Sequence, residues 1–206
     1  GAEVPTAAHW RSAWLCGPLL FLLGNGSVVL ATQWVPSGLV ALLVATVPMW
    51  LVGLDQALVQ RAAPTPRIVA GLLLGLLGIG LLYGSEGVGA TDARQRFGAV
   101  LVLLGSIAWA GGSLLGLRLA RPARPRTWAG MQMLTGGSLL ILAGLLLGEH
   151  RAFDLADVTL RSGLAFVYLI VFGALVGFSA YFYLLQHARP ALAGTYAFVN
   201  PVVAMF

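Results

Sequence analysis

Charged residues are scarce in this chain, which has 206 residues of which 9% are charged. Soluble domains usually contain about 25% charged residues, and 59% of this chain is hydrophobic. A soluble fold of this length has too little interior to bury so much apolar surface. The composition therefore excludes an ordinary soluble domain and indicates an integral membrane protein.

Cysteine is almost absent and lysine is absent. Cys16 is the single cysteine, so a disulfide framework and a Cys-rich metal site are both excluded. All twelve basic residues are Arg, and the net charge is +5. A net positive charge is compatible with nucleic-acid binding. The Arg residues, however, lie in short segments beside apolar runs, and the positive-inside rule for membrane proteins explains this placement better. We expect no nucleic acid, no metal and no cofactor among the partners.

The sequence also lacks a recognisable catalytic constellation. Its three His residues lie in loops or at the ends of apolar runs, and no pair has the spacing of metal ligands. No carboxylate pair falls inside an apolar run, and an intramembrane enzyme needs at least one reactive group there. We therefore do not expect an enzyme.

Long uncharged runs are what the chain has in place of charge. As a helix, each run is about long enough to cross a bilayer, and the first is long enough to cross it twice. Backbone groups in hydrocarbon must form their hydrogen bonds within their own segment, so these runs are predicted to be helices. The first run divides at a Pro-containing turn at residues 33–38, so the sequence predicts an all-α integral membrane protein with seven helices. The runs are residues 12–54, 68–85, 97–117, 127–148, 162–186 and 190–206.

The Arg residues are distributed unequally between the two sides of the predicted membrane. Loops on one side, beginning with the N-terminal loop, hold eight Arg, among them the four in residues 118–126. Loops on the other side hold four Arg against five acidic residues. The positive-inside rule places the Arg-rich side, and with it the N-terminal loop, in the cytoplasm.

An internal repeat is visible when the chain is shifted by 153 residues. The shift superposes Gly24 on Gly177, Gln33 on Gln186, Leu39 on Leu192 and Pro48 on Pro201. One repeat then spans five helices, and an odd number of helices inverts the second copy in the membrane, as in many secondary transporters. We expect a fragment of a ten-helix protein, in which residues 1–85 hold helices 3 to 5 of the first repeat and residues 97–206 hold helices 6 to 9 of the truncated second repeat.

Two prolines occupy matched positions inside apolar runs. Pro48 and Pro201 each remove one helical hydrogen bond and crowd the carbonyl four residues earlier, at Val44 and Ala197. Paired helix interruptions in the two halves of a transporter point to its central site, so we predict that both prolines are hinges. The alternative is that proline is simply common in membrane helices.

A few polar and aromatic side chains lie within the runs. Asn25 and Asn200 are costly to bury in hydrocarbon and should face protein or water. Trp109 lies near the centre of its run, unlike tryptophans at run ends. These residues are candidates for a cavity lining, with hydrogen bonding between helices and plain packing as the alternatives.

Several stretches together resemble the EamA family of the drug/metabolite transporter superfamily, particularly its YedA-like branch. They are Gly24-Asn-Gly26, Pro36-Ser-Gly-Leu39, Val44-Ala-Thr-Val-Pro48, residues 105–113, Pro190-Ala-Leu-Ala193 and residues 196–204. The resemblance implies a multi-pass protein of the bacterial inner membrane with two inverted five-helix repeats. It also implies a cavity lined by the third, fourth, sixth, eighth and ninth helices, which makes the following residues the expected substrate-binding set: Asn25, Trp50, Trp109, Ser113, Tyr181, Tyr196 and Asn200.

The expected function is secondary transport of a small molecule across the bilayer. We expect export of small metabolites, such as amino acids or amphipathic drugs, by alternating access. One alternative within the superfamily is a lipid or nucleotide-sugar flippase or transporter, which a basic cavity would favour. A membrane-anchored enzyme or scaffold is disfavoured, because the short loops leave no room for a soluble domain. Monomer and homodimer both remain open.

Overall fold

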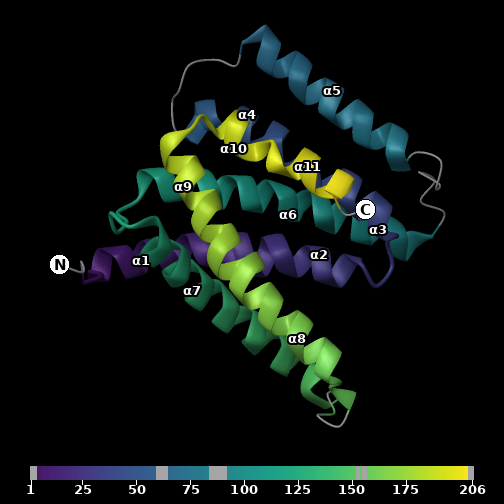
Figure 1. Cartoon of the computed structure of the whole chain (residues 1–206), viewed down its shortest axis with the longest axis vertical. Helices are drawn as coiled ribbons and strands as arrows, with labels where there is room; N and C mark the ends of the chain where they lie inside the picture. Colours follow the sequence, from purple (N-terminus) through teal and green to yellow (C-terminus); the bar gives the residue numbers. More distant parts are fainter. Residues whose placement is uncertain (1–3, 59–64, 84–91, 152–153, 155–156, 204–206) are drawn as a thin grey trace.

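Helices account for nearly all of the described chain. The computed structural model describes residues 4–58, 65–83, 92–151, 154 and 157–203, and no strand occurs within these ranges. Seven helical segments succeed one another (Figure 1): Ala7–Ala31, residues 37–58, Pro66–Tyr83, Ala93–Arg118, Pro125–Leu146, Leu160–His187 and residues 190–203. The predicted all-α membrane fold with seven helices is confirmed.

Five of these segments are long and apolar enough to cross a membrane. They are Ala7–Ala31, Ser37–Asp55, Ala93–Arg118, Pro125–Leu146 and Leu160–His187, with mean hydropathies between 1.6 and 2.2. Within Pro66–Tyr83, the described side chains of Pro66–Gly78 form a shorter apolar stretch. Large aliphatic side chains on these helices remain exposed, as at Leu74 and Ile141. Lipid tails are as apolar as these side chains, so their exposure is expected in a membrane.

The first and sixth segments share an unusual helix type at matching places. The first consists of α1 (Ala7–Gly17), the π-helix η1 (Pro18–Asn25) and α2 (Gly26–Ala31). The sixth consists of α8 (Leu160–Tyr168), the π-helix η5 (Leu169–Phe178) and α9 (Ser179–His187). Shifted by 153 residues, η1 falls on residues 171–178, so both π-helices end at equivalent positions. π-Helical turns are rare and are frequently found at functional sites.

The second segment is interrupted just before Pro48. It consists of α3 (Ser37–Val44) and α4 (Val47–Leu58). At the break, the Thr46 hydroxyl donates to the Leu43 carbonyl at 2.6 Å, and the Thr46 carbonyl accepts from the Met49 amide at 2.9 Å. Pro48 has no N–H to bond the Val44 carbonyl, and α3 ends at that residue, where the sequence predicted the kink.

The seventh segment is interrupted earlier than Pro201 alone predicts. It consists of α10 (Pro190–Gly194) and α11 (Tyr196–Val203), with the break at Thr195. The Thr195 hydroxyl donates to the Leu192 carbonyl at 2.8 Å, the same local bond that Thr46 makes. The helix then continues past Ala197. The backbones of Asn200 and Pro201 belong to α11, whereas their side chains lie outside the described residues.

Helix α6 (Ala93–Arg118) is the centre of the arrangement. It contacts η1 and α2 on one side and α3 and α4 on the other, as Figure 1 shows for the teal helix between the purple and blue ones. Helix α7 (Pro125–Leu146) packs on α1 and η1, and α9 contacts both α6 and α7. Helix α5 (Pro66–Tyr83) lies outermost and touches α3 and α11. Helices distant in sequence thus converge around the middle of α6.

The Arg-rich loop after α6 is tied to the end of that helix. The Arg121 guanidinium donates to the carbonyl oxygens of Gly116, at 3.0 Å, and Leu117. A cation bonding the last carbonyls of a helix also interacts favourably with the helix dipole. Partial burial lowers the pKa of Arg121 from its ordinary value, but an arginine in a protein keeps its charge. The loop therefore presents fixed positive charge at this end of the bundle.

Candidate functional site

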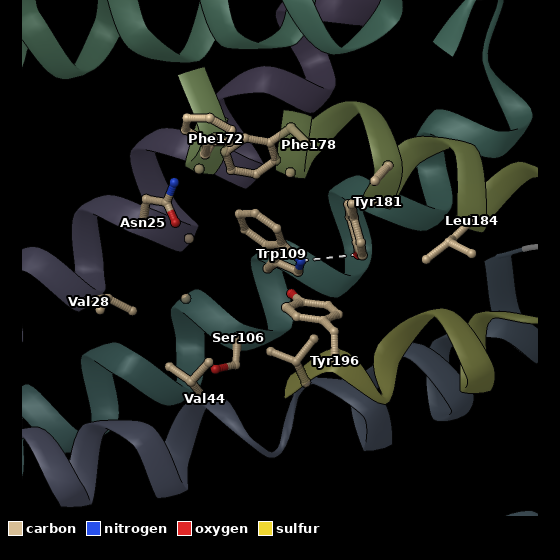
Figure 2. A pocket seen from close by; sticks show the side chains of 16 residues that line it. Asn25, Val28, Val44, Ser106, Trp109, Phe172, Phe178, Tyr181, Leu184 and Tyr196 are labelled. Atoms are coloured by element: carbon tan, nitrogen blue, oxygen red, sulfur yellow. Dashed lines mark hydrogen bonds between the residues drawn. The ribbon is translucent and has the colours of Figure 1, made fainter. Parts of the chain in front are cut away.

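A cavity of about 590 Å³ lies where the central helices meet. Its walls come from η1 and α2, the α3–α4 break, the middle of α6, η5 with α9, and α11 (Figure 2). We call it the aromatic pocket, because five ring-bearing side chains line it: Trp109, Phe172, Phe178, Tyr181 and Tyr196. Its volume is within the range of about 300–1,000 Å³ that is usual for small-molecule sites.

Ring contacts hold the wall of the aromatic pocket together. The centroid of Trp109 lies 5.7 Å from that of Tyr181 and 5.7 Å from that of Phe178. Tyr196 meets Tyr181 edge-on at 5.3 Å, and Phe21 meets Phe178 edge-on at 4.9 Å. Aromatic pairs at such distances gain about 0.5–1.5 kcal/mol beyond their area burial. The wall is therefore a coupled unit, drawn from η1, α6, η5, α9 and α11.

The Tyr181 hydroxyl is the polar centre of this wall. It accepts from the Trp109 indole N–H at 3.1 Å, drawn dashed in Figure 2, and shares a 2.8 Å hydrogen bond with the Ser113 hydroxyl. Tyr181 and Ser113 are buried. A buried hydrogen bond in a low-dielectric setting is strong and leaves costly unpaired groups when it is broken. The network therefore fixes the orientation of Trp109.

Four of the seven predicted substrate-binding residues line the aromatic pocket: Asn25, Trp109, Tyr181 and Tyr196. Figure 2 shows the Asn25 amide pointing toward the space beside Trp109. Ser113 reaches the pocket only through Tyr181. Trp50 does not line it; its indole N–H donates to the Thr46 hydroxyl at 3.1 Å, beside the α3–α4 break. The side chain of Asn200 is outside the described residues.

The prediction omitted two phenylalanines and a serine that line the pocket. Phe172 and Phe178 lie on η5, and Ser106 lies on α6 one turn before Trp109. Phenylalanine is ordinary in a membrane helix, so composition alone gives no signal for either ring. The repeat did contain a signal for Phe178, since a shift of 153 residues places it on Asn25.

Residues that a shift of 153 positions pairs with one another lie together in the lining of the aromatic pocket. Three lining residues come from the first segment, and under the shift of 153 residues each has its counterpart in the lining from the sixth segment. The pairs are Gly24 with Gly177, Asn25 with Phe178 and Val28 with Tyr181. At Gly24 a Cβ atom would lie 3.0 Å from the Trp109 ring. Glycine at this position therefore lets the π-helix approach the indole closely.

The aromatic pocket offers aromatic faces and a few neutral polar groups. No Asp, Glu, Lys or Arg is among the described residues that line it. Within the described ranges, no group of three His, Cys, Asp or Glu is placed to hold a metal ion. Such a lining suits an uncharged or amphipathic molecule with planar apolar parts, and the Asn25 amide supplies a hydrogen-bond donor and acceptor beside it.

We predict that Tyr181→Phe weakens substrate binding without unfolding the protein. The change removes the hydroxyl that pairs with Trp109 and Ser113, so the indole loses its fixed orientation. We expect the transport KM to rise about three- to tenfold, the value of one to two lost hydrogen bonds. Tyr183→Phe is the matched control, because Tyr183 is exposed two residues away on the same helix. Equal KM values for the two variants would contradict this role of the hydroxyl.

Comparison with known proteins places this arrangement in a family. The model of the EamA-like transporter family matches residues 96–206. The uncharacterized inner membrane transporter YedA of Escherichia coli strain K12 is 37% identical over 206 residues, all of this chain and 64% of YedA, and the YedA of E. coli O157:H7 matches equally. Protein PecM of Dickeya dadantii is 29% identical over 177 residues, which are 85% of this chain and 57% of PecM. No solved structure gives a significant match.

These matches extend over the helices that build the aromatic pocket. The chain spans 64% of the length of YedA, and the family model covers α6 to α11, which supply Trp109, Tyr181 and Tyr196. YedA is named as an inner membrane transporter. The helices, the spans and the similarity agree, and this chain belongs to the EamA-like transporter family of the drug/metabolite transporter superfamily.

Proposed function

We propose that the chain forms the substrate-binding part of a bacterial inner-membrane secondary transporter that exports small metabolites, such as amino acids or amphipathic drugs, by alternating access. One observation carries the proposal: the lining of the aromatic pocket includes stretches of η1 and η5, both π-helical, that a shift of 153 residues superposes. In inverted-repeat transporters the substrate sits between the repeats near the midplane. A two-fold axis between inverted repeats would bring equivalent residues together around the site, and the pairs that the shift of 153 residues gives in the pocket lining support such an arrangement.

Alternating access needs segments that change shape on either side of the site. The breaks at residues 45–46 and at Thr195 lie in the helices that carry Val44 and Tyr196 into the pocket lining. The contact between α4 and α10 is tight, since a Cβ on Gly194 would lie 3.1 Å from the Pro48 Cα. We propose that Pro48 and Pro201 are hinges and that residues 1–85 and 97–206 belong to two inverted repeats.

The lining of the pocket favours this substrate class over lipid headgroups and nucleotide sugars. A phosphate group is normally bound by Arg, Lys or a cluster of backbone amides. The described lining of the aromatic pocket has no basic side chain. An uncharged or weakly polar amphipathic molecule fits this lining without an unpaired buried charge. The ammonium and carboxylate of an amino acid would need polar partners beyond the described lining, such as groups from the rest of the full-length protein.

Transport by the full-length protein in proteoliposomes is the direct test. We expect saturable movement of at least one aromatic amino acid or amphipathic drug, accelerated by a proton gradient and inhibited by other ring-bearing compounds. The control is the same protein with Tyr181→Phe, whose KM should be higher. Movement confined to a lipid or a nucleotide sugar would contradict the proposed substrate class.

Membrane orientation gives a separate prediction. In a Cys16→Ser background, single cysteines replace Ala123, in the Arg-rich loop, and Val158, in the loop between α7 and α8; both residues are exposed. We expect a membrane-impermeant maleimide added to intact cells to label position 158 and spare position 123, because the Arg-rich side is cytoplasmic. Lysed cells should show labelling at both positions. Labelling of position 123 from outside would reverse the topology.

A further inference from the structure

One fully buried polar side chain, that of Gln132 on α7, has no hydrogen-bond partner. Seven polar side chains are buried within the described ranges, and the other six make a hydrogen bond, as the Thr135 hydroxyl does to the Ala13 carbonyl oxygen at 2.9 Å. Gln132 is 0% exposed, and neither its amide nitrogen nor its amide oxygen is paired. Buried polar groups without partners are rare in folded proteins, so this amide needs a physical explanation.

Gln132 lies at a depth between the aromatic pocket and the Arg-rich end of the bundle. Helix α7 begins at Pro125, directly after the Arg-rich loop, so Gln132 is about 10 Å into the helix. Trp109, in the pocket lining, is about 14 Å from the other end of that loop, because α6 ends nine residues later at Arg118. A molecule that moves between the pocket and the Arg-rich side therefore passes the depth of Gln132.

The packing around Gln132 closes this part of the interior. Trp128, one turn earlier on α7, belongs to a buried apolar cluster with Cys16 of α1 and Leu185 of α9. The described residues leave no surface of the Gln132 amide for water to touch. A helix of the full-length protein outside this chain cannot reach the amide either, for the same reason. A partner can therefore reach Gln132 only when the described helices change their packing.

Helix α9 is the element whose movement would uncover this interior. Helices α1 and α7 are held together, because the Thr135 hydroxyl of α7 donates to the Ala13 carbonyl oxygen of α1 in the middle of their contact. Helix α9 instead contacts α7 through apolar side chains such as Phe182 and Leu185. Such contacts can separate without breaking a buried hydrogen bond. We expect α9, rather than α1, to move away from α7.

We propose that Gln132 belongs to the transport path on the Arg-rich side of the aromatic pocket, and that its amide becomes hydrated when α9 moves away from α7. In this structure that side of the path is closed. The unpaired amide raises the free energy of the closed conformation, and water satisfies the amide in the open one, so Gln132 favours opening. This inference rests on the proposed function, because alternating access requires both conformations.

Gln132→Met tests the proposal without a transported compound. Methionine is also unbranched and has no group that needs a hydrogen-bond partner, so it should stabilise the closed conformation. For the full-length protein in mild detergent, we expect the midpoint of thermal unfolding to rise by about 2 °C or more. In inside-out membrane vesicles, Cys16, in the same buried cluster, should react with a water-soluble methanethiosulfonate reagent about tenfold more slowly, the scale of one unpaired buried amide.

Gln33→Met is the matched control, since Gln33 is exposed just after the end of α2. This change should alter neither the midpoint nor the reaction rate of Cys16. An unchanged or lower midpoint in Gln132→Met would mean that the amide is paired in the closed conformation, which overturns the proposal. An unchanged rate at Cys16, or no reaction at Cys16 in the unsubstituted protein, overturns it as well.

A cysteine in place of Gln132 shows from which side the path opens. In the Cys16→Ser background, Gln132→Cys should react in inside-out vesicles and stay unmodified in right-side-out vesicles, in which Val158→Cys reacts. Reaction from the outside, or from neither side, contradicts the proposal. If position 132 reacts as expected and proteoliposomes show no saturable transport, the proposed function fails while the hydration of this position stands. If transport is found and position 132 is inert, this inference alone fails.

Discussion

Trp109→Ala is expected to lower kcat/KM for transport by at least about 30-fold, the scale of losing a central aromatic anchor from a binding site. Trp109 contacts the rings of Phe21, Phe178 and Tyr181, and its indole N–H donates to the Tyr181 hydroxyl. Alanine removes a wall of the aromatic pocket and leaves that hydroxyl with one fewer partner. Initial rates of substrate uptake into proteoliposomes, normalised to inserted protein, give the measurement.

Two further tryptophan variants separate a site effect from a general loss of stability. Trp109→Phe keeps an apolar ring but loses the N–H, so we expect an intermediate rate. Trp14→Ala removes an indole that is 51% exposed on α1, and its rate should match the unsubstituted protein. The pocket assignment would fail if Trp109→Ala transported normally, or if Trp14→Ala lost as much activity while inserting equally well.

The membrane-spanning helices could be predicted from the sequence because charged side chains are costly to place in hydrocarbon. The gaps between charges gave six runs, and the Pro-containing turn at residues 33–38 divided the first run into two helices. Pro48 correctly marked the end of α3 at Val44. Local chemistry decides the break before Pro48, since this proline has no N–H for the Val44 carbonyl, whereas α11 continues through Pro201. The break at Thr195 was missed, because a threonine bonding a carbonyl three residues back has no distinctive sequence pattern.

The sequence does not show which face of each helix packs against the other helices. A helix that is apolar on every side has no periodic stripe to show which face meets protein. The expected set therefore included Trp50, through the family resemblance, beside Trp109, which its central position had singled out. In the structure Trp109 lines the aromatic pocket and Trp50 does not. The π-helices η1 and η5 were also invisible, since their extra residue per turn is a property of backbone bonding rather than of composition.

The sequence also does not show which glycines lie at helix crossings, where substitution has a large effect on stability. Helices α1 and α7 cross at Gly17 and Gly136, where a Cβ on Gly136 would lie 2.6 Å from the Phe21 Cβ and collide with the Gly17 carbonyl oxygen. Gly137 is the next residue on α7, and a Cβ there meets nothing within 4 Å. Sequence alone cannot distinguish these two adjacent glycines, whereas the packing makes them opposite in consequence.

We predict that Gly136→Ala destabilises the protein by about 2–3 kcal/mol, because the contacts are backbone and Cβ atoms that cannot rotate away. Gly137→Ala should be neutral or stabilising by up to about 1 kcal/mol, since alanine favours the helix more than glycine does. The measurement is the midpoint of thermal unfolding in mild detergent, followed by fluorescence-detected size exclusion. Close small-residue contacts hold membrane helices together without a hydrophobic drive, so the two alanines should move the midpoint in different directions. A shared shift would mean that α1 and α7 do not cross at Gly136.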